Sequence, residues 1–375
     1  MSAGLYSLDG ASRGRLGKVA RTTGKQPKAE VEVDKEADEQ DELIPINYIS
    51  PSMKVKVQRY LVAVEYIGSR FCGSQKQLHG RTVAGVLEEA LHKFVSHPVS
   101  VALSSRTDAG VHALSNVCHV DIERTSKRKP GELLQPHEPH VVKRAVNHFL
   151  QKNEGDIMVI DVRCVPSDFH ARFKAQERTY FYRLLCGPEP LSTFEKDRAW
   201  HVSEDLNSNA MKDACRVLVG HHDFSSFRAS GCQAKSPFKT LDELSISEVP
   251  CNPYLPFMMK DSNSFKEVDT SFKHCPTDEL CKPGNTSMES VVGVGVKAFG
   301  TRRNHRCLVV VARAQSFLYH QVRLLVGVLK AVGSGALTVS DVSKILDAKS
   351  VTAASPMAPA CGLYLGHVKY DLPLQ

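Results

Sequence analysis

Hydrophobic residues follow two different periods along this chain, and the period changes several times between residues 57 and 165. Residues 57–66 have the composition of a strand, and residues 83–95 then place apolar side chains at the spacing of an amphipathic helix with one buried face. Thr82 stands at the position of a helix N-cap. The predicted elements are strand 57–66, helix 83–95, strands 99–103 and 115–122, helix 141–150 and strand 157–165.

The second half of the chain repeats this order. Its predicted elements are strand 178–186, helix 210–219, strands 240–249 and 307–314, helix 317–332 and strand 363–370. Each half therefore resembles the split βαβ, ferredoxin-like unit. Joining two such sheets edge to edge would cover two exposed strand edges. We therefore predict an α+β fold in which two βαββαβ halves form one extended mixed sheet with helices on one face.

Two stretches fall outside the repeat. Residues 1–53 begin with a basic part in which Asp9 is the only acid among the first 29 residues, and residues 30–42 are then crowded with Asp and Glu. Such a stretch cannot bury enough apolar area to offset its ordering entropy, so we expect a disordered tail or an organelle-targeting segment. Residues 252–304 contain four prolines and polar runs, which indicate a surface insertion. The predicted organisation is this tail, an N-terminal catalytic half over 54–170, and a C-terminal half over 171–375 that carries the insertion.

Composition and charge narrow the class of protein. Hydrophobic residues make up 42% of the 375 positions and charged residues 24%, the balance of a globular protein. The net charge of +7 permits a polyanionic partner without demanding one. The eleven cysteines form no CxxC pair and no Cys/His cluster at zinc spacing, so we expect reduced thiols in an intracellular protein and no metal site. No apolar run reaches the roughly 18 to 20 residues of a membrane helix.

The segment with the clearest chemistry is residues 104–113, Ser-Ser-Arg-Thr-Asp-Ala-Gly-Val-His-Ala, which connects two predicted strands. Loops on a rigid sheet commonly display reactive side chains. Asp108 is followed by the small residues Ala109 and Gly110, so the backbone can turn sharply and leave the carboxylate open. The guanidinium of Arg106, two residues earlier, favours an ionised carboxylate. From the residues alone, the same pattern also fits an Asp turn beside a surface arginine.

This loop is one of six sequence blocks that follow one another between residues 57 and 370. They are Phe71-Cys-Gly-Ser-Gln with the helix from Thr82, Arg106-Thr-Asp-Ala-Gly-Val-His, Asp168-Phe-His-Ala-Arg-Phe with Arg178-Thr-Tyr-Phe-Tyr, Gly220-His-His-Asp-Phe-Ser-Ser-Phe, Gln315-Ser-Phe-Leu-Tyr-His-Gln-Val-Arg, and Ala358-Pro-Ala-Cys-Gly-Leu-Tyr-Leu. Together they resemble the TruA family of transfer-RNA pseudouridine synthases, and most of all its eukaryotic pseudouridine-synthase-like branch, which includes organellar enzymes. Two positions depart from the bacterial pattern, which has Gly where Ser105 stands and Trp where Ser74 stands.

The resemblance implies an isomerase that converts uridine to pseudouridine in the anticodon stem-loop of tRNA, at positions of the 38–40 type. It implies that Asp108 is the catalytic carboxylate and that Tyr180 stacks against the target base, which must leave the helical stack. Arg106 is expected to fill the vacated space and to pair with Asp108, and Arg323 to lie beside the carboxylate. No metal or redox cofactor is expected, because the product is an isomer of the substrate. Bacterial relatives act as dimers, so we expect a homodimer.

Other interpretations stay open on the sequence. A non-catalytic RNA-binding protein on the same fold is the main alternative, and a hydrolase that releases free base is another. A protein that had lost its activity would have no physical reason to keep Arg106, Asp108, Tyr180 and Arg323 together. Whether Asp108 attacks the sugar or removes a proton from it is not decided by the sequence. The basic leader favours a mitochondrial or other organellar location over the cytoplasm or nucleus.

Overall fold

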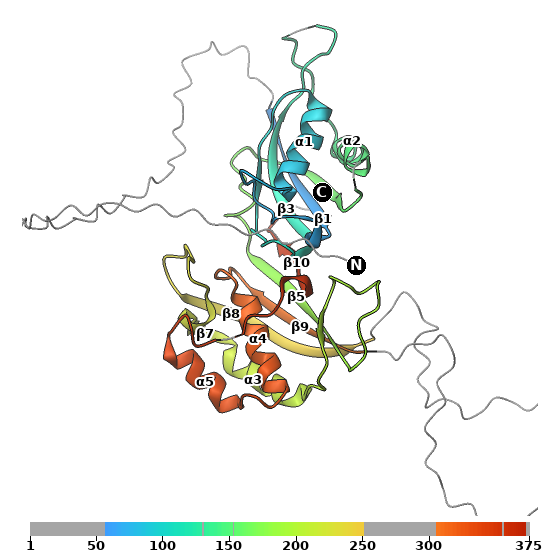
Figure 1. Ribbon diagram of the computed structural model, residues 1–375. Coiled ribbons are helices and arrows are strands. Elements are labelled where there is room, and N and C mark those ends of the chain that lie inside the picture. The colour runs from blue at the N-terminus through green and yellow to red at the C-terminus, as the bar shows by residue number, and fades with distance from the viewer. Residues whose placement is uncertain (1–56, 130, 153, 251–304, 355, 373–375) are drawn as a thin grey trace, which may run out of the picture. The chain divides into compact units, whose positions relative to one another are not determined.

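One mixed sheet forms the centre of the protein, and strands from both halves of the chain take part in it (Figure 1). The computed structural model describes residues 57–129, 131–152, 154–250, 305–354 and 356–372. The ten strands found there are β1 (Val57–Tyr66), β2 (Val101–Leu103), β3 (His112–Glu123), β4 (Ile157–Val165), β5 (Glu177–Cys186), β6 (Trp200–Val202), β7 (Gly220–Asp223), β8 (Phe238–Val249), β9 (Arg306–Ala314) and β10 (Leu363–Lys369). Their order in the sheet is β4-β1-β3-β10-β5-β9-β8-β7, with β2 paired to β3 and β6 paired to β5. The predicted tail and the predicted insertion lie outside the described residues.

Each half of the sheet has the strand order of a ferredoxin-like unit. In the first half β1 lies between β4 and β3, and in the second half β5 lies between β10 and β9. The halves join where β10 runs parallel to the start of β3, with Tyr364 beside His112 and Leu365 beside Ala113. The short strand β2 pairs only with the later part of β3, from Cys118 to Val120. The start of β3 is therefore open for β10. The predicted α+β fold, with two βαββαβ halves in one mixed sheet, is confirmed.

The helices of the described residues form two groups over the sheet. Their bounds are α1 (Val83–Val95), α2 (Pro139–Gln151), α3 (Ser208–Leu218), α4 (Gln321–Gly333) and α5 (Val339–Ala348). Helices α1 and α2 pack together beside the N-terminal strands, and α3 packs against α4, α5 and β8 (Figure 1). Buried and half-buried positions alternate along β5 and β9, as expected when helices cover one face of a sheet. Thr82 caps α1 as predicted, since its hydroxyl accepts a hydrogen bond from Gly85 N.

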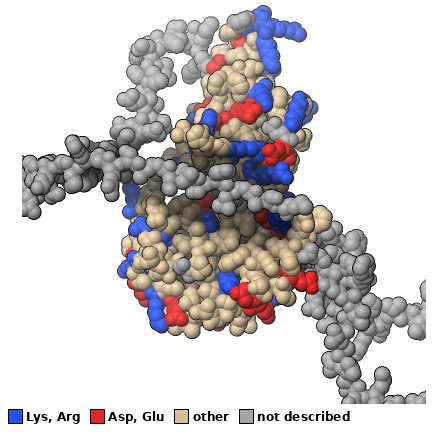
Figure 2. Space-filling view, viewed as in Figure 1, with Lys and Arg blue, Asp and Glu red and all other residues tan. Residues whose placement is uncertain are grey.

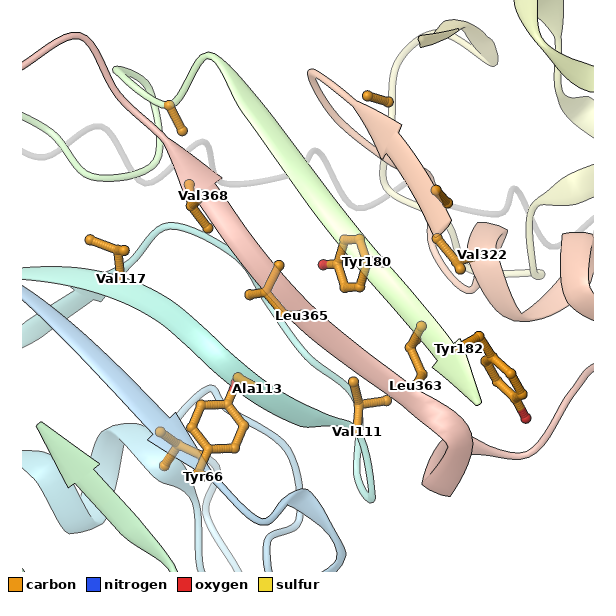
Figure 3. Packing of buried hydrophobic residues seen from close by; sticks show 14 of the residues in the cluster. Tyr66, Val111, Ala113, Val117, Tyr180, Tyr182, Val322, Leu363, Leu365 and Val368 are labelled. Carbon is orange, nitrogen blue, oxygen red and sulfur yellow. The ribbon is translucent and has the colours of Figure 1, made fainter. Parts of the chain in front are cut away.

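A continuous hydrophobic cluster crosses the junction between the halves. Tyr66 from β1, Leu363 and Leu365 from β10, and Tyr180 and Tyr182 from β5 all belong to it (Figure 3). Burial of a large apolar side chain contributes about 1.5–3 kcal/mol. The junction is therefore held by packing as well as by the β3–β10 pairing, and the loop before β3 begins on a fixed frame.

The predicted element boundaries are wrong in two places that matter for the loops. The helix predicted for 317–332 begins only at Gln321, because His320 adopts a left-handed backbone conformation with φ of 61° and stops the helix from extending toward Phe317. The strand predicted from residue 115 begins already at His112. The pattern also does not predict α5, although Thr338 and Asp341 form a capping box at its start.

Candidate active site

Asp108 lies in the connection between β2 and β3, as its sequence context predicts. Its carboxylate is partly exposed, with 29% of the side-chain surface open. The backbone N–H of Val111 donates to Asp108 O at 3.1 Å, and Gly110 adopts a positive φ of 84° that favours glycine. The turn presents the carboxylate at the surface of a cavity, while Thr107 on one side and Val111 on the other are buried.

Buried polar side chains fix the backbone just before Asp108. The hydroxyl of Ser74 accepts from Thr107 N at 2.8 Å, and Ser74 N donates to Thr107 O at 3.0 Å. Tyr66 Oη and Thr107 Oγ1 are 2.8 Å apart, and Asn116 Nδ2 donates both to Tyr66 Oη and to Ser105 O. Because these groups are buried and satisfied, movement of the loop would leave several polar atoms without partners. The network therefore gives Asp108 a defined position.

Arg178 of β5 is a second anchor for this loop. The side chain is only 9% exposed, and its guanidinium donates to Ser105 Oγ at 3.2 Å and to Ser104 O and Arg172 O at 3.0 Å each. It also donates to Gln315 O, directly after β9. Burial lowers the pKa of Arg178. The acceptors belong to the loop that carries Asp108, to Arg172 and to the residue that follows β9. One buried cation therefore links the two halves of the chain at the site.

Two side chains contact the Asp108 carboxylate. His320 Nε2 lies 3.2 Å from Asp108 Oδ2, and Arg323 Nη1 lies 3.7 Å from the same oxygen. Arg323 is itself held by a hydrogen bond from its Nε to Ala358 O at 2.8 Å. Burial lowers the pKa of His320, while Asp108 raises it and Arg323 lowers it. A neutral imidazole with its proton on Nε2 can donate to the carboxylate at neutral pH.

Tyr180 projects from β5 into the same cavity and is 8% exposed. Its ring meets Phe317 edge to face, with the ring centroids 5.1 Å apart. Burial raises the pKa of the Tyr180 hydroxyl well above its ordinary value, and the charge of Asp108 adds to this. In Figure 3 the ring lies beside Leu365 of the neighbouring strand. Tyr180 is thus a neutral aromatic surface close to Asp108.

Arg106 is exposed and lines the cavity, but it does not contact Asp108 as the resemblance implies. Its Nη1 donates to Gln233 Oε1 at 3.3 Å, whereas the described side chains that contact the Asp108 carboxylate are His320 and Arg323. Burial and the charge of Arg172 lower the pKa of Arg106. The expected role of Arg106 in filling the space of a flipped base stays a prediction.

These residues surround one cavity of about 900 Å³. Its walls come from the segments 72–77, 104–111, 231–234 and 316–323 and from β5. The charged groups on the walls are Arg106, Asp108, Arg172, Arg178 and Arg323, and His320 lies among them. One carboxylate among four guanidinium groups suits a polyanionic substrate, because phosphate oxygens prefer arginine.

Among the described residues no three His, Cys, Asp or Glu side chains are grouped as metal ligands would be. No helix of the described part is both long and apolar enough to cross a membrane.

Comparisons with known proteins agree with this geometry. The model of the tRNA pseudouridine synthase family matches residues 62–174 and 214–371. The tRNA pseudouridine synthase A of Rhodospirillum centenum is 38% identical over 314 residues, which cover 84% of this chain and 100% of that protein. Those of Parvibaculum lavamentivorans and Roseobacter denitrificans are 36% and 34% identical over 84% of this chain and 99% and 97% of their own lengths. The fold and site define an RNA-modifying isomerase, and the chain belongs to the tRNA pseudouridine synthase family.

Sequence reasoning found part of this site. The structure places Asp108, Tyr180, Arg106 and Arg323 on the walls of one cavity, and brings Arg323 to Asp108 as expected. The structure also brings His320 and Arg178 to the loop that carries Asp108, and the sequence assigned no role to either residue. Both lie inside quoted sequence blocks, but neither spacing nor composition indicates that they reach the loop before β3.

Proposed function

We propose that the protein isomerises uridine to pseudouridine in the anticodon stem-loop of tRNA, at positions of the 38–40 type, with Asp108 as the catalytic carboxylate. The class of reaction follows from family membership, and the choice of stem-loop is our inference from the TruA resemblance. The observation that carries the assignment of Asp108 is its place in the arginine-lined cavity, held by His320 and Arg323 and facing Tyr180.

The reaction needs a group that can act at the sugar of an unstacked nucleotide. The bond between N1 and C1′ breaks, the base turns, C5 bonds to C1′, the proton on C5 is lost and N1 gains one. Atoms and electrons balance without an oxidant or a second substrate. Asp108 can serve either as nucleophile at C1′ or as base toward a ribose proton, and the contacts with His320 and Arg323 hold the carboxylate in place in both cases.

The other side chains have positioning roles in this proposal. Tyr180 offers a buried ring against which the extruded base can stack. Arg106, exposed at the rim, can enter the space that the base leaves. Arg323 and His320 hold the carboxylate, and Arg172 and Arg178 add positive charge to the wall of the cavity that receives phosphates.

The test is to incubate the purified protein with unmodified tRNA transcripts and to map pseudouridine chemically. Tritium release from C5-labelled uridine gives the rate. Asp108→Asn keeps the size of the side chain, so we expect release to fall below detection while tRNA binding and the melting temperature change little. Asp223→Asn is the matched control, because Asp223 accepts a hydrogen bond from Ser225 N away from the cavity and should leave turnover measurable. A rate near wild type for Asp108→Asn would refute the assignment, and no pseudouridine with any transcript would favour a non-catalytic RNA-binding protein.

We also propose a homodimer and an organellar, mitochondrial location. The dimer rests on the resemblance to bacterial enzymes, and sedimentation of the full chain tests it. The location rests on the basic, nearly acid-free first 29 residues. Fusion of residues 1–53 to a fluorescent protein tests it, since the proposal requires the fusion to enter an organelle.

A further inference from the structure

A second cavity, of about 610 Å³, lies at the other end of β3 from Asp108. It is bounded by the last turn of α1, the end of β3 with the segment that follows it, and the outer face of α2. None of its lining residues belongs to the catalytic cavity. Ser104 of the catalytic cavity lies beside Val117 of β3, because Ser104 N donates to Val117 O, and Glu123 of the second cavity is six residues further along the strand, so the two cavities are about 20 Å apart along β3. The second cavity is therefore a separate feature from the catalytic site.

The cavity combines an apolar floor with a cationic rim. The floor consists of Phe94, Val95, Leu134, Ala145 and Phe149. The rim carries the cations Lys93, Arg124, Lys127 and Arg144 and the carboxylate of Glu123, and Lys93 forms an ion pair with Glu89 of α1. Within the part of the chain that the structure describes, neither Lys127 nor Arg144 forms an ion pair. Figure 2 shows Lys and Arg side chains gathered over the part of the molecule that carries α1 and α2.

Two aromatic pairs line this space. The rings of Phe94 and His137 have centroids 4.7 Å apart, and those of His148 and Phe149 are 5.3 Å apart and edge to face. Burial and the charge of Arg124 lower the pKa of His137, which keeps its ring neutral. Flat rings next to the cations of Lys127 and Arg144 suit a ligand that has both an aromatic face and a phosphate.

The rim is held in place by backbone pairing. Leu134 N donates to Arg124 O at 2.8 Å, Thr125 pairs with Leu133, and Arg124 Nη1 donates to Gln135 O at 3.1 Å. Arg124 and Lys127 thus lie in or next to a backbone stretch that is held by pairing. A preformed cavity of this size is in the range of small-ligand sites, so an incoming group needs little rearrangement of the protein.

We propose that this cavity binds an unpaired nucleotide of the substrate tRNA, in an arm remote from the target uridine, with its base on the aromatic floor and its phosphate on Arg144 and Lys127. The occupant follows from charge complementarity, because the substrate of this enzyme family is a polyanion and the rim is cationic. A nucleotide explains the apolar floor as well, which a bare phosphate does not. An isolated stem-loop lacks that remote arm and so occupies the catalytic cavity alone, whereas a folded tRNA can reach both cavities.

The experiment compares a full-length tRNA transcript with the isolated stem-loop in which pseudouridine is mapped. Arg144→Glu should weaken binding of the full-length transcript about tenfold and reduce the salt dependence of its affinity by about one unit of slope. The same variant should bind the stem-loop within about twofold of wild type and leave kcat unchanged on both RNAs. Lys127→Glu should have the same effects as Arg144→Glu. Phe149→Leu, which keeps an apolar side chain but removes the ring, should weaken binding of the full-length transcript by a few-fold.

Lys212→Glu is the matched control, because Lys212 is an exposed lysine on α3, away from the cavity. It should bind both RNAs like wild type. The proposal would be overturned if Arg144→Glu weakened binding of the full-length transcript and of the stem-loop equally, or if Lys212→Glu weakened binding of the full-length transcript as much as Arg144→Glu does. Either result would show a general electrostatic effect. Unchanged binding of the full-length transcript by both Arg144→Glu and Lys127→Glu would also overturn it. Pseudouridine formation is measured on the stem-loop independently of this cavity. A failure of the second-cavity proposal is therefore distinguishable from a failure of the synthase assignment.

Discussion

His320 and Asp108 meet across the active cavity although 211 residues separate them, and the imidazole Nε2 at 3.2 Å is closer to the carboxylate than the guanidinium of Arg323 at 3.7 Å. His320 reaches this position from a left-handed backbone conformation directly before α4. A strained conformation at a residue other than glycine costs free energy, and such residues are concentrated at functional sites. The pair therefore defines a positioning role for His320.

Replacement of His320 tests this role. His320→Asn tolerates the left-handed conformation but has a shorter side chain that does not reach Asp108 Oδ2. We expect kcat to fall by about 10- to 100-fold, because misplacement of a reacting group by about 1 Å has effects of this size. Binding of tRNA and the melting temperature should change little. Tritium-release kinetics and filter binding provide the measurement, and an unchanged kcat would mean that Arg323 alone holds the carboxylate.

Arg106→Lys separates charge from shape at the rim of the cavity. A planar guanidinium can stack in the space of an extruded base, whereas an ammonium cannot. We expect turnover to fall by more than about tenfold, equivalent to about 1.4 kcal/mol of transition-state stabilisation, with tRNA affinity within several-fold of wild type. Single-turnover kinetics on tRNA measures this. Wild-type turnover in Arg106→Lys would show that the guanidinium of Arg106 is not needed in the space that the extruded base leaves.

Arg178→Lys should affect stability and activity together. The ammonium cannot reach the oxygens of Ser104, Ser105 and Gln315 at once, so buried acceptors lose their donors. We expect a loss of about 2–4 kcal/mol in the free energy of unfolding, measured by denaturant titration. Arg163→Lys on β4 is the control, since 40% of the Arg163 side chain is open and its ion pair is with the exposed Asp161. A stable Arg178→Lys variant would show that this buried cation is not an anchor of the loop.

His119 makes stability depend on pH. Burial, with a contribution from the charge of Arg59, lowers the pKa of His119 to about 4, and its Nδ1 accepts a hydrogen bond from Ala171 N, which requires an unprotonated nitrogen. The unfolded chain takes up this proton near its ordinary pKa of 6.5. Stability is therefore full above pH 6.5 and is lost as the pH falls from about 6.5 to about 4, by about 1–3 kcal/mol.

Thermal melting across this pH range compares wild type with His119→Gln, whose amide oxygen can still accept from Ala171 N. The variant should show a smaller fall in melting temperature between pH 7 and pH 4.5. If both proteins lose the same stability, other groups are responsible for the pH dependence.

The sequence predicted the elements that repeat and the loop that carries Asp108, because periodicity and a sequence motif are local properties. The structure places Tyr180 and Arg323, which the same motifs single out, on the walls of the cavity, and their roles stay predictions. The contacts of His320 and Arg178 were not predicted, because they depend on how α4 and β5 approach a loop far away in the chain. The start of α4 was missed for a related reason. Phe317 and Leu318 fit the helical spacing, and only the backbone of His320 shows that they belong to the wall of the cavity.

The parallel pairing of β10 with β3 also constrains when the enzyme can assemble during synthesis. Of the described strands, β10 is the last to leave the ribosome, yet it lies in the middle of the sheet and completes the edge of β3 next to the catalytic loop. Until then β5 also lacks its partner on that side. Closing a sheet through contacts this distant in sequence is slow, and the open edges invite pairing with other chains. We therefore expect a nascent chain that has not yet released residues 363–369 to be inactive and prone to pair with other chains through its open strand edges.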